Sequence, residues 1–179
     1  ASATPTASAT PTASATPTNT PTATATATPT LAQPTALPNC SGSGLVIVKT
    51  ANTYSARNGD PITFTICIIN NTGAPVLIES ITDTLPSTWT WSSPLCDITV
   101  RPDLACSQPA TNTIAWGHPT LGSFVTLNPT ERIDLKIHGS YSGIAAGTSV
   151  CNNAVADYKV TLSDGTVLGG NSPCIIIQP

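Results

Sequence analysis

The sequence contains few charged and few aromatic residues. Charged residues make up 8% of the 179 residues, aromatic residues make up 4%, and methionine is absent. Six Lys and Arg stand against nine Asp and Glu, which gives a formal net charge of −3, and no basic run occurs. Nucleic acids and anionic membranes are bound through clustered positive charge, so this composition argues against both as partners.

Long hydrophobic runs are also missing. No stretch of about 18 apolar residues occurs, so we expect no segment that spans a membrane. The chain begins at Ala1 without the pattern of a signal peptide. Either a signal has been removed or the sequence is a fragment of a longer protein.

The signatures of catalysis and cofactor binding are absent as well. The sequence has no phosphate-binding loop and no dinucleotide fingerprint. His118 and His138 lie far apart and outside any local catalytic signature. Turn formation accounts for Asp60, Asp83 and Asp164, and the other acids are too scattered to suggest a glycosidase pair. We therefore expect a protein that is not an enzyme, with no metal and no cofactor.

Cysteine, in contrast, is plentiful, and all six cysteines lie after residue 39. Their even number, the lack of a Cys-x-x-Cys pair and the presence of only two His favour disulfides over a zinc site. Spacing alone leaves many pairings open. From the geometry of the expected hairpins we predict the pairs Cys40–Cys67, Cys96–Cys106 and Cys151–Cys174. Disulfides indicate an oxidising, extracellular setting.

The first 30 residues contain only Ala, Ser, Thr, Pro and one Asn. Every even position from Ser2 to Thr30 is Ser or Thr, and every odd position from Ala1 to Pro29 is Ala or Pro, with one exception. In an extended strand this period of two places all the hydroxyl groups on one side and the small apolar groups on the other. In a polyproline II helix the same hydroxyl groups would spread around the axis.

We call residues 1–39 the strap and expect them to be extended and O-glycosylated, since Ser/Thr-rich tracts with Pro are typical substrates. The alternative is a flexible linker whose regularity reflects a repeated DNA unit. The prolines exclude a central strand, because proline cannot donate to the ladder. The O-glycosylation candidates are Ser2, Thr4, Thr6, Ser8, Thr10, Thr12, Ser14, Thr16, Thr18, Thr20, Thr22, Thr24, Thr26, Thr28 and Thr30.

Residues 40–179 read as many short strands separated by turns, without a helical period. Residues 61–70 alternate apolar and polar residues, and Asp164-Gly165 is a strong hairpin signal. Residues 94–109 contain several prolines and are expected to form a loop. The pattern predicts an all-β fold: a single immunoglobulin-like antiparallel β-sandwich that carries an extended, low-complexity N-terminal segment.

Three motifs occur in succession in this part: Gly59-Asp60-Pro61-Ile62-Thr63-Phe64, Asn70-Asn71-Thr72-Gly73 and Ile81-Thr82-Asp83-Thr84-Leu85-Pro86. Together they resemble the conserved-repeat family of prokaryotic surface proteins known as domain of unknown function 11, over about residues 45–177. The resemblance implies an immunoglobulin-like sandwich with an extracellular structural or adhesive role and without catalytic residues. The six cysteines and the single module depart from the strings of modules that are usual in that family.

Several individual residues are candidates for chemistry. An amide bond between Lys49 and Asn153, assisted by Asp83 or Glu79, would resemble the cross-links of similar-looking adhesins. The alternative is a solvated lysine and an asparagine that bonds within a turn.

Trp89 and Trp91 are candidates for stacking against sugars, or else they fill the core. Asn39 and Asn70 match the N-glycosylation acceptor pattern.

These observations predict a non-enzymatic, extracellular structural subunit of a cell-surface filament or layer. The strap would assemble along neighbouring copies of the same chain, so the partners would be a homopolymer and covalently attached glycans. The alternative is an adhesive or carbohydrate-binding module of a larger secreted protein, with the strap as a glycosylated linker. Exposed tryptophans in a groove would favour that alternative.

Overall fold

The computed structural model describes residue 2 and residues 39–98, 101–152 and 158–179. The chain divides into two units, Ala1–Thr30 and Leu31–Pro179. Of the first unit only Ser2 is described, and it is exposed. The alternation of the strap and the other O-glycosylation candidates lie outside the described residues, so the predictions made for them stay predictions.

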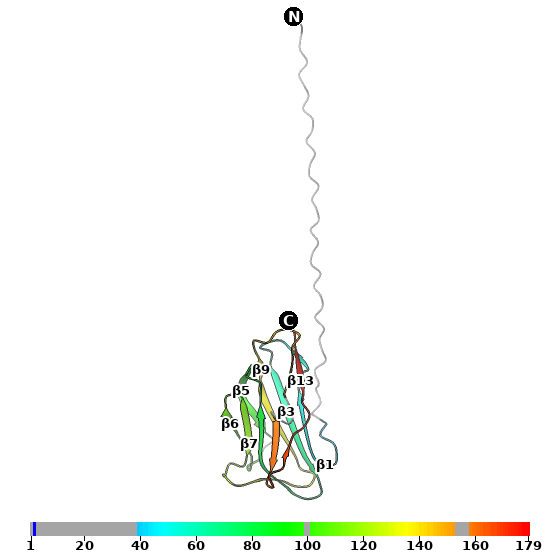
Figure 1. Ribbon diagram of the computed structural model, residues 1–179, viewed down its shortest axis with the longest axis vertical. Coiled ribbons are helices and arrows are strands. Elements are labelled where there is room, and N and C mark those ends of the chain that lie inside the picture. Colours follow the sequence, from blue (N-terminus) through cyan, green and yellow to red (C-terminus); the bar gives the residue numbers. More distant parts are fainter. Residues whose placement is uncertain (1, 3–38, 99–100, 153–157) are drawn as a thin grey trace. The chain divides into compact units, whose positions relative to one another are not determined.

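The described part of the second unit is built from strands and contains no helix. The strands are β1 (Gly44–Ala51), β2 (Ser55–Ala56), β3 (Ile62–Asn71), β4 (Val76–Thr84), β5 (Trp89–Ile98), β6 (Ala105–Ala110), β7 (Thr113–Gly117), β8 (Val125–Leu127), β9 (Arg132–Tyr141), β10 (Ser149–Cys151), β11 (Tyr158–Leu162), β12 (Val167–Leu168) and β13 (Cys174–Ile177). In Figure 1 the long strands β3, β9 and β5 lie next to one another along the vertical axis of the view.

Four of these strands form an antiparallel sheet in the order β1-β3-β9-β5. The alternation in its two central strands is the one that the sequence predicts. Ile62, Phe64, Ile66 and Ile68 of β3 are buried, as are Ile133, Leu135, Ile137 and Tyr141 of β9. Since side chains of a strand alternate between the two faces, one face of this sheet is apolar and forms a side of the core.

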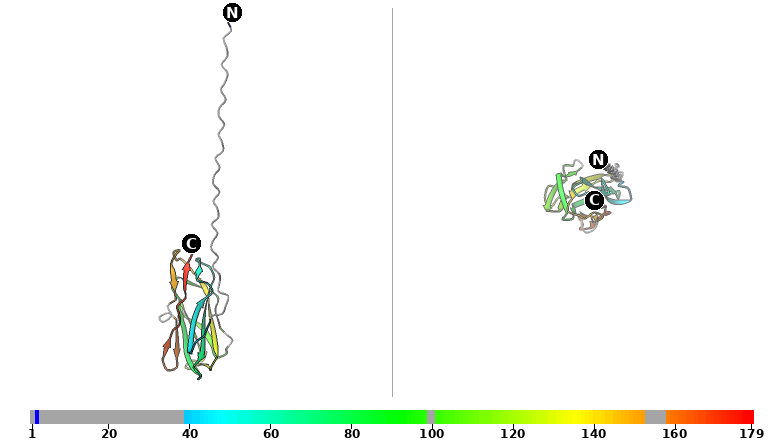
Figure 2. Two further views of the ribbon diagram at one scale, coloured as in Figure 1. Left: turned by 90° about the vertical axis from the view of Figure 1, so that its right-hand side faces the viewer. Right: turned by 90° about the horizontal axis from the view of Figure 1, so that it is seen from above.

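A second, six-stranded sheet follows the order β12-β11-β4-β7-β6, and β8 also pairs with β4. Its buried face carries Ile78 and Ile81 of β4, Ile114 and Trp116 of β7, and Val160 of β11. Inward-facing residues of both sheets belong to one hydrophobic core. The described part of the second unit is therefore a two-layer β-sandwich, which Figure 2 shows from two further directions.

The order of the strands is that of an immunoglobulin-like domain. The sheet β1-β3-β9-β5 corresponds to the order A-B-E-D, and β12-β11-β4-β7 corresponds to G-F-C-C′. One difference is that β5 precedes β7 in the chain, whereas the C′ strand of a variable-type domain precedes D. A small third sheet, β10-β13-β2, contains the parallel pair β13 and β2.

The region expected to be a loop, residues 94–109, contains the end of β5 and most of β6 instead. Proline is tolerated there because both strands lie at the edge of their sheets, where a missing N–H leaves no ladder partner unpaired. The pairing of β5 with β9 shifts register between Trp91 and Cys96, around Pro94. The prolines predicted a loop, and this prediction was wrong because strands at the edge of a sheet tolerate proline.

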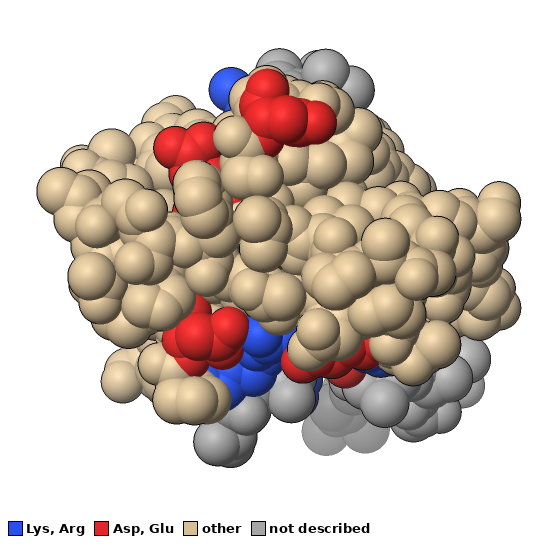
Figure 3. Space-filling model, turned by 90° about the horizontal axis from the view of Figure 1, so that it is seen from below, with Lys and Arg blue, Asp and Glu red and all other residues tan. Residues whose placement is uncertain are grey.

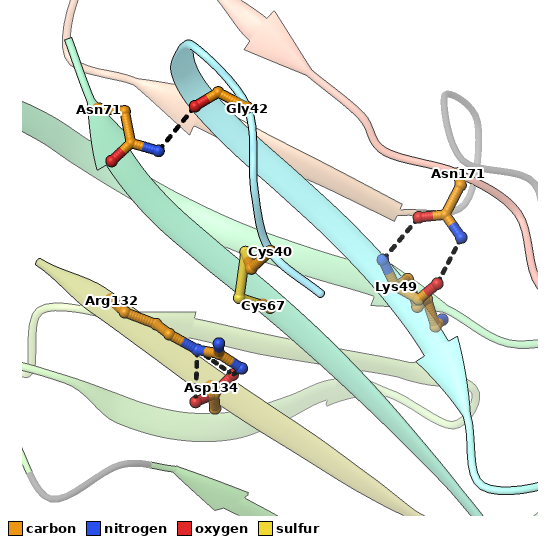
Figure 4. The surroundings of a disulfide bond; sticks show 8 residues. All are labelled: Cys40, Gly42, Lys49, Cys67, Asn71, Arg132, Asp134 and Asn171. Atoms are coloured by element: carbon orange, nitrogen blue, oxygen red, sulfur yellow. Dashed lines mark hydrogen bonds and ion pairs between the residues drawn. A yellow bond between two sulfur atoms is a disulfide. The ribbon is translucent and has the colours of Figure 1, made fainter. Parts of the chain in front are cut away.

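The structure joins the three cysteine pairs expected from the sequence: Cys40–Cys67, Cys96–Cys106 and Cys151–Cys174. The first attaches the segment before β1 to the central strand β3, as Figure 4 shows. The second joins β5 to β6 and so connects the edges of the two large sheets. The third joins β10 to β13 within the small sheet. Each bridge of this kind contributes about 2–4 kcal/mol to stability.

Gly139 in β9 provides a test of this packing. A methyl group there would lie 2.3 Å from the carbonyl oxygen of Thr90 and 2.5 Å from the Trp89 indole. We expect Gly139→Ala to lower the free energy of unfolding by about 1–3 kcal/mol, because backbone and a core indole would have to move. Denaturant unfolding monitored by tryptophan fluorescence measures the change.

Gly117→Ala in β7 is the matched control, since its added methyl group meets only the Glu79 carbonyl oxygen at 3.4 Å. We expect its effect to be clearly smaller. Equal losses in the two variants would show that the tight contact at Gly139 does not determine stability.

Candidate functional site

The core contains a cluster of polar side chains, which we call the buried triad: Lys49, Asp83 and Asn152. All three have no exposed surface. Burying such groups costs free energy unless each finds a partner, so their presence needs an explanation.

Strand alternation places Lys49 in the core. On β1, Leu45 and Ile47 pack against the core, Ala51 is buried, and Lys49 shares their parity. Lysine therefore occupies a position that the pattern assigns to an apolar residue. Its Nζ lies 4.6 Å from the centre of the Phe64 ring on the neighbouring strand.

Asp83 occupies the equivalent kind of position in the other sheet. It lies on β4 with the parity of the buried residues Ile81 and Leu85. On its two sides β4 pairs with β7 and β11. The ion pair between Lys49 Nζ and Asp83 Oδ2 thus joins the two sheets through the core.

Asn152 completes the triad directly after β10. Its Nδ2 donates a hydrogen bond of 2.5 Å to Asp83 Oδ1. Among the described residues its Oδ1 has no hydrogen-bond partner. One carboxylate therefore binds the lysine amine through one oxygen and the side-chain amide through the other.

The surroundings of the triad are apolar. Tyr141 packs edge-on against Trp89, with ring centres 5.1 Å apart, and its hydroxyl group is buried. Burial, together with the charge of Asp83, raises the pKa of Tyr141 well above its ordinary value, so the phenol stays neutral. The side chains of the triad and of Tyr141 have no surface exposed to solvent, and such burial strengthens the electrostatic interactions between them.

The backbone of Lys49 is held from outside by Asn171. The Lys49 N–H donates to Asn171 Oδ1 at 2.8 Å, and Asn171 Nδ2 donates to the Lys49 carbonyl at 2.5 Å. Figure 4 shows both bonds on the outer side of β1. The amide of Asn171 therefore takes the place of a neighbouring strand at this edge and fixes the position of Lys49.

The structure brings together two of the residues that the sequence singles out for an amide bond, Lys49 and Asp83. Glu79 is exposed, so it is not the assisting acid. Asn153 lies outside the described residues. Sequence reasoning missed Asn152, although Asn152 shares the parity of Val150, which packs against the core.

The two tryptophans do not form an exposed platform for sugars. Trp89 is 6% exposed and packs between Phe64 and Tyr141. Trp91 is partly buried, lies edge-on to Trp89, and donates from its indole nitrogen to the Thr111 carbonyl at 2.7 Å. For Trp89 the alternative of filling the core holds, which corrects its assignment as a sugar-stacking residue.

The two N-glycosylation candidates differ in accessibility. Asn39 is exposed. Asn70 is fully buried: its Nδ2 donates to the carbonyls of Ala74 and Leu127, both at 2.7 Å, and its Oδ1 accepts from the N–H and hydroxyl of Thr72. A glycan on this nitrogen is incompatible with the fold, which corrects the expectation for Asn70.

Several other charged residues form pairs at or near the surface. Arg101 binds Asp103 and Glu131, and this hydrogen-bonded guanidinium lowers the pKa of Asp103. His138 lies 3.0 Å from Asp97. The face shown in Figure 3 is mostly uncharged, with small groups of acidic and basic residues. Within the described ranges no cluster of His, Cys, Asp or Glu could hold a metal ion, and no helix is long and apolar enough to cross a membrane.

Comparison with known proteins gives similarity of fold only. No protein-family model and no curated protein sequence matches the chain, so the resemblance to the conserved-repeat family stays a prediction. Among solved structures, the major pilin subunit of Bacillus cereus matches with a TM-score of 0.52 at 9% identity, over 74% of this chain and 40% of the pilin.

A protein from Corynebacterium diphtheriae described as membrane anchored matches with a TM-score of 0.52 at 10% identity, over 81% of this chain and 37% of that protein. An uncharacterised protein from Nocardia farcinica, described as immunoglobulin-like, gives 0.47 at 13% identity, over 74% and 98% of the two chains. The chain thus spans well under half of the pilin and of the anchored protein. At these identities the similarity shows the fold alone.

Asn70 yields a prediction about stability. Asn70→Asp keeps the shape of the side chain but turns the donor that faces two carbonyl oxygens into an acceptor. We expect a loss of about 2–3 kcal/mol in the free energy of unfolding, measured by chemical denaturation at neutral pH. Asn71→Asp is the control, because Asn71 is exposed and makes one bond of 2.9 Å to the Gly42 carbonyl. The control should lose less than about 1 kcal/mol, and a similar loss in both variants would contradict the role assigned to Asn70.

Proposed function

We propose that this chain is a non-enzymatic structural subunit of an extracellular, cell-surface filament or layer. The observation that carries the proposal is the two-residue period of residues 1–30, which form most of the strap and are joined to Cys40 by the nine residues 31–39. A flexible linker does not need alternating residue types, whereas an extended segment that lies against a protein surface needs one side that packs and one side that faces solvent. The β-sandwich would be the repeating body, and the strap would connect one copy to the next.

The features of the folded unit support an extracellular role. It has three disulfides and a surface that carries little charge. Disulfides persist in oxidising compartments and make a domain resistant to unfolding outside the cell. The likeness in fold to a pilin subunit is in keeping with this proposal.

The strap itself would do the assembling. Its Ala and Pro side is small and apolar and would lie on the sandwich of a neighbouring copy. Its Ser and Thr side would face outward and carry O-linked glycans, from Ser2 to Thr30. Addition of an extended segment to an exposed sheet edge is a common mode of recognition, and β5, β6 and β12 are edge strands of the large sheets.

The motifs that resemble the conserved-repeat family of surface proteins fit the same proposal. In the alternative, the chain is an adhesive or carbohydrate-binding module and the strap is only a glycosylated linker. The burial of Trp89 in the core removes one of the two aromatic residues on which sugar binding would depend.

The period of two can be tested by changing the length of the strap. Deleting Ala13 alone shifts the hydroxyl groups before it to the other side of the strap. Deleting Ala13 and Ser14 together restores their side with almost the same composition. We expect the single deletion to reduce polymer formation strongly and the double deletion to retain it, as measured by electron microscopy and sedimentation of the full chain.

A variant that lacks residues 1–38 should stay monomeric. Equal assembly of the single and double deletions would show that the strap acts as a linker without a defined face. A full-length protein that stays monomeric under all conditions would instead support the alternative of a module within a larger protein.

Glycosylation of the strap is tested separately. Trypsin should release residues 1–49 from the reduced and alkylated natural protein when the Lys49 side chain is unmodified, or a larger fragment that contains them when it is modified. We expect this fragment to carry sugars on its Ser and Thr residues, located by mass spectrometry with electron-based fragmentation. A fragment of unmodified mass would contradict O-glycosylation.

A further inference from the structure

We propose that Lys49 and Asn152 react with each other to form an intramolecular amide bond, and that Asp83 is the catalytic carboxyl group. The inference goes beyond the proposed function, because it depends neither on polymer formation nor on glycosylation. It concerns the buried triad alone.

The first argument is the placement of the reacting groups. The Lys49 amine and the Asn152 amide nitrogen are bound to the two oxygens of one carboxylate. The nucleophile and the leaving group are therefore held side by side. Fixing two reactants in this way removes most of the entropic cost of bringing them together.

The second argument is the cost of the unreacted arrangement. A buried ion pair is often no more stabilising than apolar residues of the same volume. Here Lys49 and Asp83 occupy core positions, and the amide oxygen of Asn152 has no partner among the described residues. Stability alone gives no reason for this choice of residues, whereas a reaction that removes the charge of the lysine does.

The reaction balances without any outside reagent. Asp83 accepts a proton from the Lys49 ammonium, which leaves a neutral amine. The amine nitrogen attacks Cγ of Asn152, and the carbonyl electron pair moves onto oxygen. When the carbonyl reforms, the Cγ–Nδ2 bond breaks, and Asp83 passes protons from the attacking nitrogen to the leaving one.

The products are a secondary amide between Lys49 Nζ and Asn152 Cγ and one neutral ammonia molecule. Asp83 gives a proton to the leaving nitrogen, takes one from the attacking nitrogen and ends as a neutral carboxylic acid, so no unpaired charge stays in the core. General acid–base transfer by a positioned carboxyl group requires the contacts that Asp83 makes to both nitrogens.

The bond would connect parts that are distant in the chain. Lys49 lies on β1 at the edge of one large sheet, and Asn152 follows β10 in the small sheet. No disulfide joins these two segments, since Cys151 is bonded to Cys174 and β1 contains no cysteine. The amide would therefore close a loop that the three disulfides leave open.

Peptide mapping of the full chain decides the question. The protein would be produced in a host that adds no glycans, with its disulfides formed, then denatured, reduced, alkylated and digested with trypsin. An acylated Lys49 is not cleaved, so the proposal predicts residues 1–57 joined to residues 137–159, one ammonia lighter than the sum of the two peptides. Separate peptides 1–49 and 50–57 would overturn it.

Two controls exclude other sources of the mass change. Asn58-Gly59 can lose ammonia by forming a succinimide, but that change stays within residues 58–132 and joins no peptides. Fragmentation of the joined peptide assigns the bond to Asn152 or to Asn153. Assignment to Asn153, or loss of the bond in Asn153→Ala, would overturn the choice of Asn152.

The role of Asp83 is tested with a matched pair of variants. Asp83→Asn should give no joined peptide, because the amide cannot carry protons between the nitrogens. Glu79→Gln, on the same strand but exposed, should be joined to the same extent as the wild type. A joined peptide in Asp83→Asn would overturn the catalytic role, and if this variant fails to fold, the result for the wild-type chain still decides whether the bond forms.

Discussion

The meeting of Lys49 and Asp83 inside the core constrains the whole sandwich. Each residue comes from a different sheet, and each lies on a face whose side chains are mostly apolar. A slip of one residue in either strand would turn a charged group outward and leave its partner buried alone. Breaking a buried pair in this way costs about 3–5 kcal/mol, so the pair fixes the register of β1 and β4 and the relation between the two layers.

Several other features act around this constraint. Asn171 occupies the outer edge of β1 at the level of Lys49, and Asn152 supplies the second bond to the carboxylate. Both residues belong to the last third of the chain, whereas Lys49 lies in the first strand. Residues from the beginning and from the end of the fold thus meet at the buried triad, so the packing of the early strands β1 and β4 depends on contacts with late segments of the chain.

Where the sequence pattern is local, it predicts the structure well. The alternation in residues 61–70 predicts β3, because successive side chains of a strand point to opposite faces of the sheet. Asp164-Gly165 predicts the turn between β11 and β12, because these residue types favour the backbone conformation of a tight turn. The resemblance of motifs to a family of surface proteins pointed to the same class of fold. Asp83 illustrates the limit: its motif allowed two interpretations, a turn residue or the acid that assists an amide bond, and only its neighbours in space show that it is buried beside Lys49.

The missed features depend on contacts between distant parts of the chain. The pairing of β13 with β2 involves two-residue and four-residue strands, too short for a periodic signal. Two asparagines follow β10, and which of them points to the core depends on the alternation of the strand. With only three residues, β10 is too short for this alternation to be recognised from the sequence. The prolines near β5 and β6 suggested a loop because the edge position of these strands cannot be read from composition.

The disulfide between Cys40 and Cys67 has a mechanical consequence. Tension applied to the chain ahead of Cys40 would pass through two sulfur atoms into β3, which is hydrogen-bonded on both sides, and not into the terminal strand β1. Peeling a sheet from its edge breaks ladder bonds one after another, whereas loading an inner strand requires many of them to shear at once. A single covalent link placed at the root of the strap would thus decide how much pull the domain withstands before it opens.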